Sequence, residues 1–228
     1  MENKTFIEIE YIGKIGETGE IFDLTDEKTA KENNIYNPNT RYGPTTIIIG
    51  ENMILKSLED RLKKMKPKQK QKITLKPEEA FGKREPKLLK IFSLAFFRKQ
   101  KITPIQGQYI TLGDNMQGKV LSVSAGRVKI DFNHPLSGKT LEYEITLNKI
   151  VTDQKEKITR LLERTFGLDK KDIQVSSTKE KTTITLPTPK EIPKEAKSKI
   201  TEIIKKHIKD LKEIEILNKN PEVANTKK

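Results

Sequence analysis

The stretch that decides the fold is Asp131-Phe132-Asn133-His134-Pro135-Leu136-Ser137-Gly138-Lys139-Thr140-Leu141, in the second half of the chain. It lies between two segments, 127–132 and 140–150, whose composition predicts β-strands. On its N-terminal side, residues 84–130 hold the most apolar run of the protein and four glycines that separate short strand-like segments. We therefore interpret 84–130 as an insertion, after which the chain returns to the sheet that it left.

Four further segments precede this stretch in order. They are Tyr11, the pair Phe22-Asp23, residues 47–59 and residues 77–82. Together with 131–141 they resemble the signature of the long, SlyD-like FKBP-type peptidyl-prolyl isomerases. The resemblance covers residues 1 to 150 and leaves the C-terminal third of the chain outside it.

The composition bounds the class of protein. Of 228 residues, 33% are hydrophobic and 34% are charged, a mixture that suits several small cores better than one large core. Cysteine is absent, which excludes a disulfide framework and a cysteine metal site. Neither a signal peptide nor a run of about 20 apolar residues is found, so we expect a soluble, cytoplasmic protein without membrane contact.

The formal net charge of +13 leaves two interpretations open. A nucleic-acid or ribosome partner would explain it. The lysines are, however, interleaved with glutamates, as on solvated surfaces, and no RNA-binding motif accompanies them. We favour the solvated surface and keep the RNA or ribosome partner as an alternative.

The isomerase domain is predicted to be discontinuous, made of residues 1–83 and 131–151. Alternating residues predict strands at 6–12, 20–24, 45–49 and 71–75, with Glu8 and Glu10 on the solvent face of the first. Residues 25–43 are polar and are expected to be irregular, and Asn52 is expected to cap a short helix.

A third unit is predicted at 152–217, with the element order α-β-β-α-β. Asp153 and Glu156 have the spacing of a capping box, and Gly167 ends the helix that carries Ile158, Leu161, Leu162 and Phe166 on one face. Residues 218–228 are expected to be a disordered tail. The fold class is therefore α+β: an FKBP-like antiparallel half-barrel sheet around a short helix, a small β-rich insert domain in the flap at 84–130, and the C-terminal domain.

The resemblance implies peptidyl-prolyl cis-trans isomerase activity in an apolar hollow. Rotation about an X-Pro bond costs about 20 kcal/mol because amide resonance is lost, and a dry pocket favours the twisted amide. No nucleophile, metal or cofactor is needed. The residues that the resemblance assigns as catalytic are Tyr11, Phe22, Asp23, Ile54, Leu55, Phe81 and Tyr143, while Ile47 and Leu58 form the floor and Leu136 the edge.

The insert resembles the insert-in-flap domain of these isomerases, which acts as a chaperone for unfolded chains. A unit of roughly 45 residues cannot bury all its large apolar side chains, so we expect some of them to be exposed. The residues assigned to client binding are Phe92, Leu94, Phe96, Phe97 and Ile102.

Partners follow from the same resemblance. The expected substrates are unfolded or proline-containing polypeptides, and the longer archaeal members with a C-terminal domain are dimeric. A stripe of Ile200, Ile203, Ile204 and Ile208 offers apolar surface for a homodimer. The alternative to catalysis is a module that holds a fixed proline segment of a partner, for example at the ribosome, without turnover.

Overall fold

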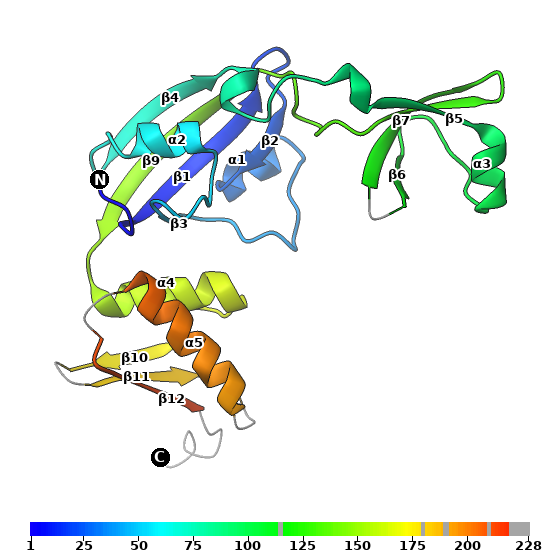
Figure 1. The fold of residues 1–228 in the computed structure, drawn as a ribbon. Helices are drawn as coiled ribbons and strands as arrows, with labels where there is room; N and C mark the ends of the chain where they lie inside the picture. The colour runs from blue at the N-terminus through cyan, green and yellow to red at the C-terminus, as the bar shows by residue number, and fades with distance from the viewer. Residues whose placement is uncertain (114–115, 179–180, 189–191, 209–210, 219–228) are drawn as a thin grey trace. The chain divides into compact units, whose positions relative to one another are not determined.

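The computed structural model describes residues 1–113, 116–178, 181–188, 192–208 and 211–218 (Figure 1). The predicted tail at 219–228 lies outside these residues. The chain divides into two compact units: Met1–Ile12, Leu24–Lys72 and Glu144–Lys228 form the first, and Gly13–Asp23 and Ile73–Tyr143 form the second. Each unit is described by itself. These boundaries cut across those of the three predicted domains.

The predicted strands of the isomerase domain are present. They form a five-stranded sheet with the order β2-β1-β9-β4, in which β3 also pairs with β1. The β1–β3 pair is antiparallel, with Phe6 opposite Ile48 and Glu8 opposite Thr46. The bounds are β1 Phe6–Ile15, β2 Ile21–Leu24, β3 Thr45–Ile48, β4 Gln69–Leu75 and β9 Leu141–Val151.

Two helical details differ from the sequence prediction. The segment expected to be irregular contains α1 (Glu27–Glu32), which Asp26 caps by accepting from the Thr29 N–H at 2.8 Å. Helix α2 (Lys56–Leu62) begins only after Leu55, and Asn52 has a left-handed φ of 51° instead of capping it. The prediction failed because a polar segment does not reveal which of its residues start a helix.

The insert segment forms its own antiparallel sheet, with the order β5-β8-β7-β6 (Figure 1). Its core consists of Phe97, Leu112, Val120, Val128 and Ile130, all 0–5% exposed. Gly118 permits this packing, because a Cβ there would lie 2.5 Å from a methyl carbon of Ile130. The elements of the insert are the 3-10 helix Pro86–Leu88, β5 Leu89–Ser93, α3 Leu94–Lys99, β6 Tyr109–Leu112, β7 Met116–Ser124 and β8 Arg127–Asp131, and a further 3-10 helix, Pro77–Glu79, precedes the insert.

The C-terminal segment has the predicted α-β-β-α-β order. Asp153 caps its first helix by accepting from the Glu156 N–H at 2.8 Å, and Gly167 ends that helix with φ 67°. The three strands have the order β10-β11-β12, with β11 and β12 parallel. The bounds are α4 Gln154–Phe166, β10 Gln174–Ser177, β11 Lys181–Leu186, α5 Lys194–His207 and β12 Glu213–Asn218.

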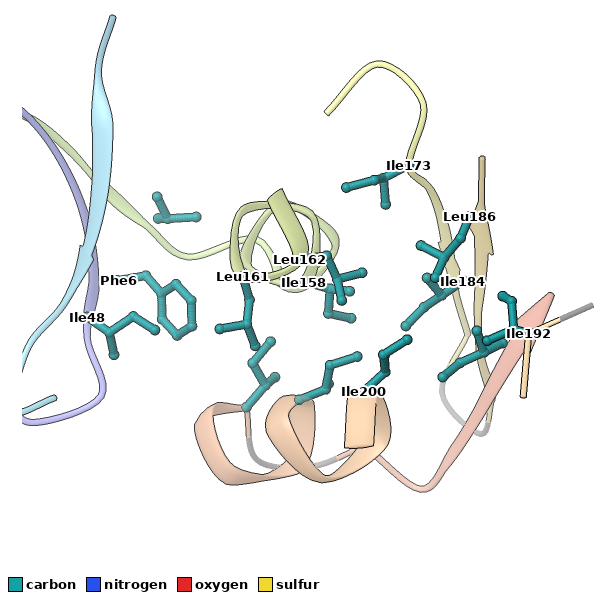
Figure 2. Close-up of a cluster of buried hydrophobic side chains, with 14 residues drawn as sticks. Phe6, Ile48, Ile158, Leu161, Leu162, Ile173, Ile184, Leu186, Ile192 and Ile200 are labelled. Atoms are coloured by element: carbon teal, nitrogen blue, oxygen red, sulfur yellow. The ribbon is translucent and has the colours of Figure 1, made fainter. Parts of the chain in front are cut away.

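One hydrophobic core joins the C-terminal segment to the β1–β3 edge within the first unit. Figure 2 shows Phe6 and Ile48 pointing from the two strands toward Leu161 of α4. Glu8 was expected to face solvent, but it lies on the same covered face of β1 and is only 8% exposed. The sequence prediction for Glu8 failed because α4, more than 140 residues away along the chain, covers this face of the strand.

Most of the predicted isoleucine stripe of α5 is buried in this same core. Ile200, Ile204 and Ile208 are 0–6% exposed within the single chain, and Ile203 packs against the same cluster. Phe166, which was predicted to share the buried face of α4 with Ile158, Leu161 and Leu162, is 42% exposed instead. Surplus apolar surface on α5 is therefore no argument for a dimer. Within the described residues no helix is long and apolar enough to cross a membrane.

Candidate active site

An aromatic pair marks the centre of the predicted site in the second unit. The rings of Phe22 and Tyr143 meet edge to face, with centroids 5.6 Å apart and an interplanar angle of 88°. Gly13 lies against both rings: a Cβ there would be 2.8 Å from Phe22 Cζ and 3.1 Å from Tyr143 Cε1. The glycine is therefore required by the close approach of the rings and not by its backbone conformation.

Tyr143 is held as a neutral phenol. Its side chain is 6% exposed, and this burial, with the nearby carboxylate of Asp23 as a second cause, raises its pKa to about 12. Both effects disfavour the phenolate. The hydroxyl is protonated at neutral pH, as in any tyrosine, and the raised pKa extends the neutral form into more alkaline solution.

A second aromatic contact connects residue 81 to the signature stretch. The ring of Phe81 stacks on His134, with centroids 4.1 Å apart and an interplanar angle of 2°. The hydroxyl of Ser137 donates to the Phe81 carbonyl at 3.0 Å, and the Leu136 N–H donates to His134 Nδ1 at 3.1 Å. Leu136 and Phe81 are both half-buried. His134 thus supports the turn and the ring.

The remaining predicted site residues lie in the first unit. Ile47 and Leu58 are 2% and 4% exposed, whereas Tyr11, Ile54 and Leu55 are half-buried. Within the described residues, the Ile54 N–H has no acceptor. A backbone donor without an internal partner is available to a ligand carbonyl.

Glu59 supports the segment that leads to Ile54. Its side chain is 6% exposed, accepts the Gly50 N–H at 3.1 Å and pairs with Lys63 at 2.9 Å. The buried carboxylate of Glu59 therefore satisfies the backbone of the turn at Gly50.

A polar clamp fastens both ends of the insert, and the sequence reasoning missed it. Asp131 pairs with Arg84 and accepts the Asn133 N–H at 3.0 Å. Asn133 in turn accepts the Glu85 N–H at 2.8 Å and donates to the Glu85 carbonyl at 3.1 Å. The Asp-Phe-Asn start of the signature stretch therefore binds the outgoing strand to the returning one. The Asp-x-Asn spacing beside an apolar insert was the available signal.

The predicted client-binding residues of the insert differ in exposure. Phe96 is 36% exposed and stacks on half-buried Phe92 at 5.4 Å, and Leu94 and Ile102 are half-buried. Phe97 is 0% exposed, so its assignment to the client surface is wrong: it points from α3 into the core of the insert. Exposed apolar residues that the sequence reasoning missed are Ile91 at 63%, Ile105 at 52%, Tyr109 and Met116 at 48% and Val123 at 38%.

Comparison with known proteins finds similarity both in the insert and along the first two thirds of the chain. The family model of the FKBP26 IF domain matches residues 90–136. A short-type peptidyl-prolyl cis-trans isomerase of Methanocaldococcus jannaschii is 28% identical over 151 residues, which are 66% of this chain and 94% of that protein.

Two bacterial relatives extend the comparison. A protein of Pseudomonas fluorescens, named probable FKBP-type 16 kDa peptidyl-prolyl cis-trans isomerase, is 30% identical over 108 residues, 46% of this chain and 71% of the relative. The FKBP-type isomerase SlyD of Helicobacter pylori is 29% identical over 123 residues, 53% of this chain and 60% of the relative. With its sheet, its aromatic pair and its insert, the chain belongs to the SlyD-like FKBP-type peptidyl-prolyl cis-trans isomerases.

Proposed function

We propose that the chain isomerises X-Pro bonds in a hollow lined by the aromatic pair and that its insert supplies the client. The observation that carries this proposal is the edge-to-face contact of Phe22 and Tyr143 over Gly13. The other residues proposed for the hollow are Tyr11, Asp23, Ile47, Ile54, Leu55, Leu58, Phe81 and Leu136.

The mechanism requires only shape and desolvation. A planar amide is more polar than the twisted amide at the top of the rotational barrier, so removing water favours the twisted state relative to the planar one. Apolar walls around the prolyl ring provide this environment. Because no bond is made or broken, the site needs no proton transfer.

Two polar groups are proposed to orient the peptide. The Ile54 N–H, which has no acceptor within the described residues, would bind a substrate carbonyl. The Asp23 carboxylate lies near enough to Tyr143 to help raise the pKa of its phenol, and we propose that this carboxylate orients the peptide at the rim of the hollow. Each neutral hydrogen bond of this kind contributes about 1 kcal/mol.

The insert is proposed to capture unfolded chains on its exposed apolar residues. Ile91 and Phe96 are large side chains that the small core of the insert does not cover. Exposed apolar side chains gathered on a small unit bind apolar segments of other chains. Capture raises the concentration of prolyl bonds near the hollow.

The test separates capture from chemistry. Replacing residues 89–130 by a short loop preserves the Arg84–Asp131 and Glu85–Asn133 clamp. Isomerisation of a tetrapeptide should change little, while proline-limited refolding of a protein should slow by about one to two orders of magnitude. Equal loss on both substrates would refute the division of labour.

Point variants test the role of the insert more specifically than the loop replacement. Ile91→Ser with Phe96→Ser should reduce only the refolding activity, and Phe166→Ser, which removes a similarly exposed ring outside the insert, is the matched control. If the parent chain binds proline peptides but accelerates neither reaction, the non-catalytic binding module is the correct function. Homodimerisation stays a prediction from the family resemblance, and light scattering of the full chain tests it.

A further inference from the structure

A basic pocket lies within the first unit, lined by residues from β1, the 41–46 segment, β9, the second half of α4 and the 167–171 segment that follows it. Its volume is about 830 Å³, inside the range of about 300–1,000 Å³ that is usual for small-ligand sites. Six cationic side chains line it, against three carboxylates. The chain has only seven arginines, and three of them, Arg41, Arg160 and Arg164, are at this pocket.

Part of this charge is explained by the fold. Arg160 is 14% exposed and pairs with Glu8, Glu156 and Glu163, while Lys149 pairs with Glu156 at 2.6 Å. These contacts hold α4 on the strands, and they leave little of the Arg160 guanidinium for a ligand.

Arg41 also has a structural role. Its guanidinium donates to the carbonyls of Gly167 at 2.5 Å and Leu168 at 3.2 Å. These carbonyls follow the last turn of α4, where unpaired acceptors need donors. The contact fixes the 41–46 segment beside the C-terminal end of the helix and leaves the charge of Arg41 in the pocket wall.

Three cations have no such explanation. Within the described residues, Arg164, Lys170 and Lys171 form no ion pair and no side-chain hydrogen bond, and all three are exposed. The one carboxylate left over in the pocket wall, Asp169, accepts the backbone N–H of Lys171 at 3.0 Å. The mutual repulsion of these three cations is therefore not offset by ion pairs within the chain, and a bound anion would relieve it.

A buried hydroxyl provides an independent sign of a ligand. Thr46 lines the same pocket and is 9% exposed, and its Oγ1 has no hydrogen-bond partner within the described residues. It lies opposite Glu8 in the β1–β3 register. Burying a hydroxyl without a hydrogen-bond partner is unfavourable, and a ligand oxygen would satisfy it.

We propose that this pocket binds phosphate groups of a nucleotide, either free or within single-stranded RNA. Arginine and lysine side chains that converge from separate segments, with a hydroxyl donor beside them, suit a ligand with several oxyanions. Tyr42 also lines the pocket and stacks on exposed Tyr36 with centroids 5.4 Å apart. An aromatic pair beside basic residues is the arrangement on which bases stack.

The experiment compares three probes on the full chain: a nucleoside triphosphate, a short single-stranded RNA and a poly-glutamate peptide. The variant Arg164→Gln/Lys170→Gln/Lys171→Gln removes the three unpaired cations. The matched control, Lys194→Gln/Lys199→Gln/Lys205→Gln, removes the same charge from exposed positions of α5 that do not line the pocket. Tetrapeptide isomerisation by both variants verifies that the chain is folded.

The pocket variant should lose at least about tenfold in affinity for a phosphate probe, and the control much less. With RNA, the slope of log affinity against log salt should also fall by about 2–3. Tight RNA binding with a steep slope identifies a nucleic-acid backbone, and tight binding of the nucleotide alone identifies a small ligand. Equal losses in both variants, equal binding of poly-glutamate, or no binding of either phosphate probe would overturn the proposal.

Discussion

Gly13→Ala should damage the active site while sparing the fold. The new methyl group would lie 2.8 Å from Phe22 Cζ, whereas carbon atoms in contact are about 3.5–4.0 Å apart. The ring tip of Phe22 must therefore retreat by about 0.7–1.2 Å. A misplacement of about 1 Å near reacting groups costs up to about 100-fold in rate, so we expect kcat/KM on a tetrapeptide to fall about 10- to 100-fold.

The stability of the same variant should change little. Alanine in a strand is favoured over glycine by about 0.5–1 kcal/mol, which offsets part of the cost of moving one partly exposed ring. Urea unfolding measures this difference. Gly16→Ala is the control, because its Cβ would meet only Thr140, at 3.3 Å and beyond.

A double-mutant cycle isolates the cause. Phe22→Leu removes the Cζ atom that the new methyl group strikes, so Gly13→Ala should have little further effect in that background. An unchanged kcat/KM for Gly13→Ala, or the same loss in both backgrounds, would show that the contact between Gly13 and the ring does not shape the site.

Three further outcomes test the fold and its electrostatics. Arg160→Ala should lower the free energy of unfolding by about 3 kcal/mol, because it leaves Glu8 buried without its partner. Replacing both Glu8 and Arg160 by leucine should recover most of this loss of stability. Equal losses for the single and the double variant in urea unfolding would contradict the reasoning. An alkaline titration followed by phenolate absorbance should show one tyrosine near pH 12 that Tyr143→Phe removes, and because the folded-state pKa is raised, the stability from this residue should fall only as the pH rises above about 10. Burial would raise the pKa of Asp131, but hydrogen bonds from Asn133 lower the pKa overall. The contribution of Asp131 to the free energy of unfolding should therefore be present above about pH 4 and lost in more acidic solution. An Asp131→Asn variant with an unchanged acid-unfolding profile would exclude this contribution.

Much of this architecture could be predicted from local patterns. The alternation at 6–12 predicts β1, and the Asp153 cap with Gly167 brackets α4 to within a residue. Such signals succeed because they depend on neighbours within one turn of helix or one strand. The ordered motifs likewise predict the family that the comparisons show.

The side chains of the site required the tertiary structure. The sequence predicts that Phe22, Tyr143 and Phe81 are important. It does not predict that Gly13 makes room for the rings of Phe22 and Tyr143, or that His134 stacks on Phe81. Phe97 shows the opposite failure, since an apolar run does not reveal which member faces the core.

What the sequence by itself determined is the set of elements and the family, because periodicity, caps and motif order are properties of short segments. What only the tertiary structure decided is how distant segments cover one another. Helix α4 buries Glu8, pairs it with Arg160, and creates a basic pocket beside Thr46 from residues more than 100 positions apart. No local pattern encodes such a surface, because its charge and its burial arise only when two separately predictable segments pack together.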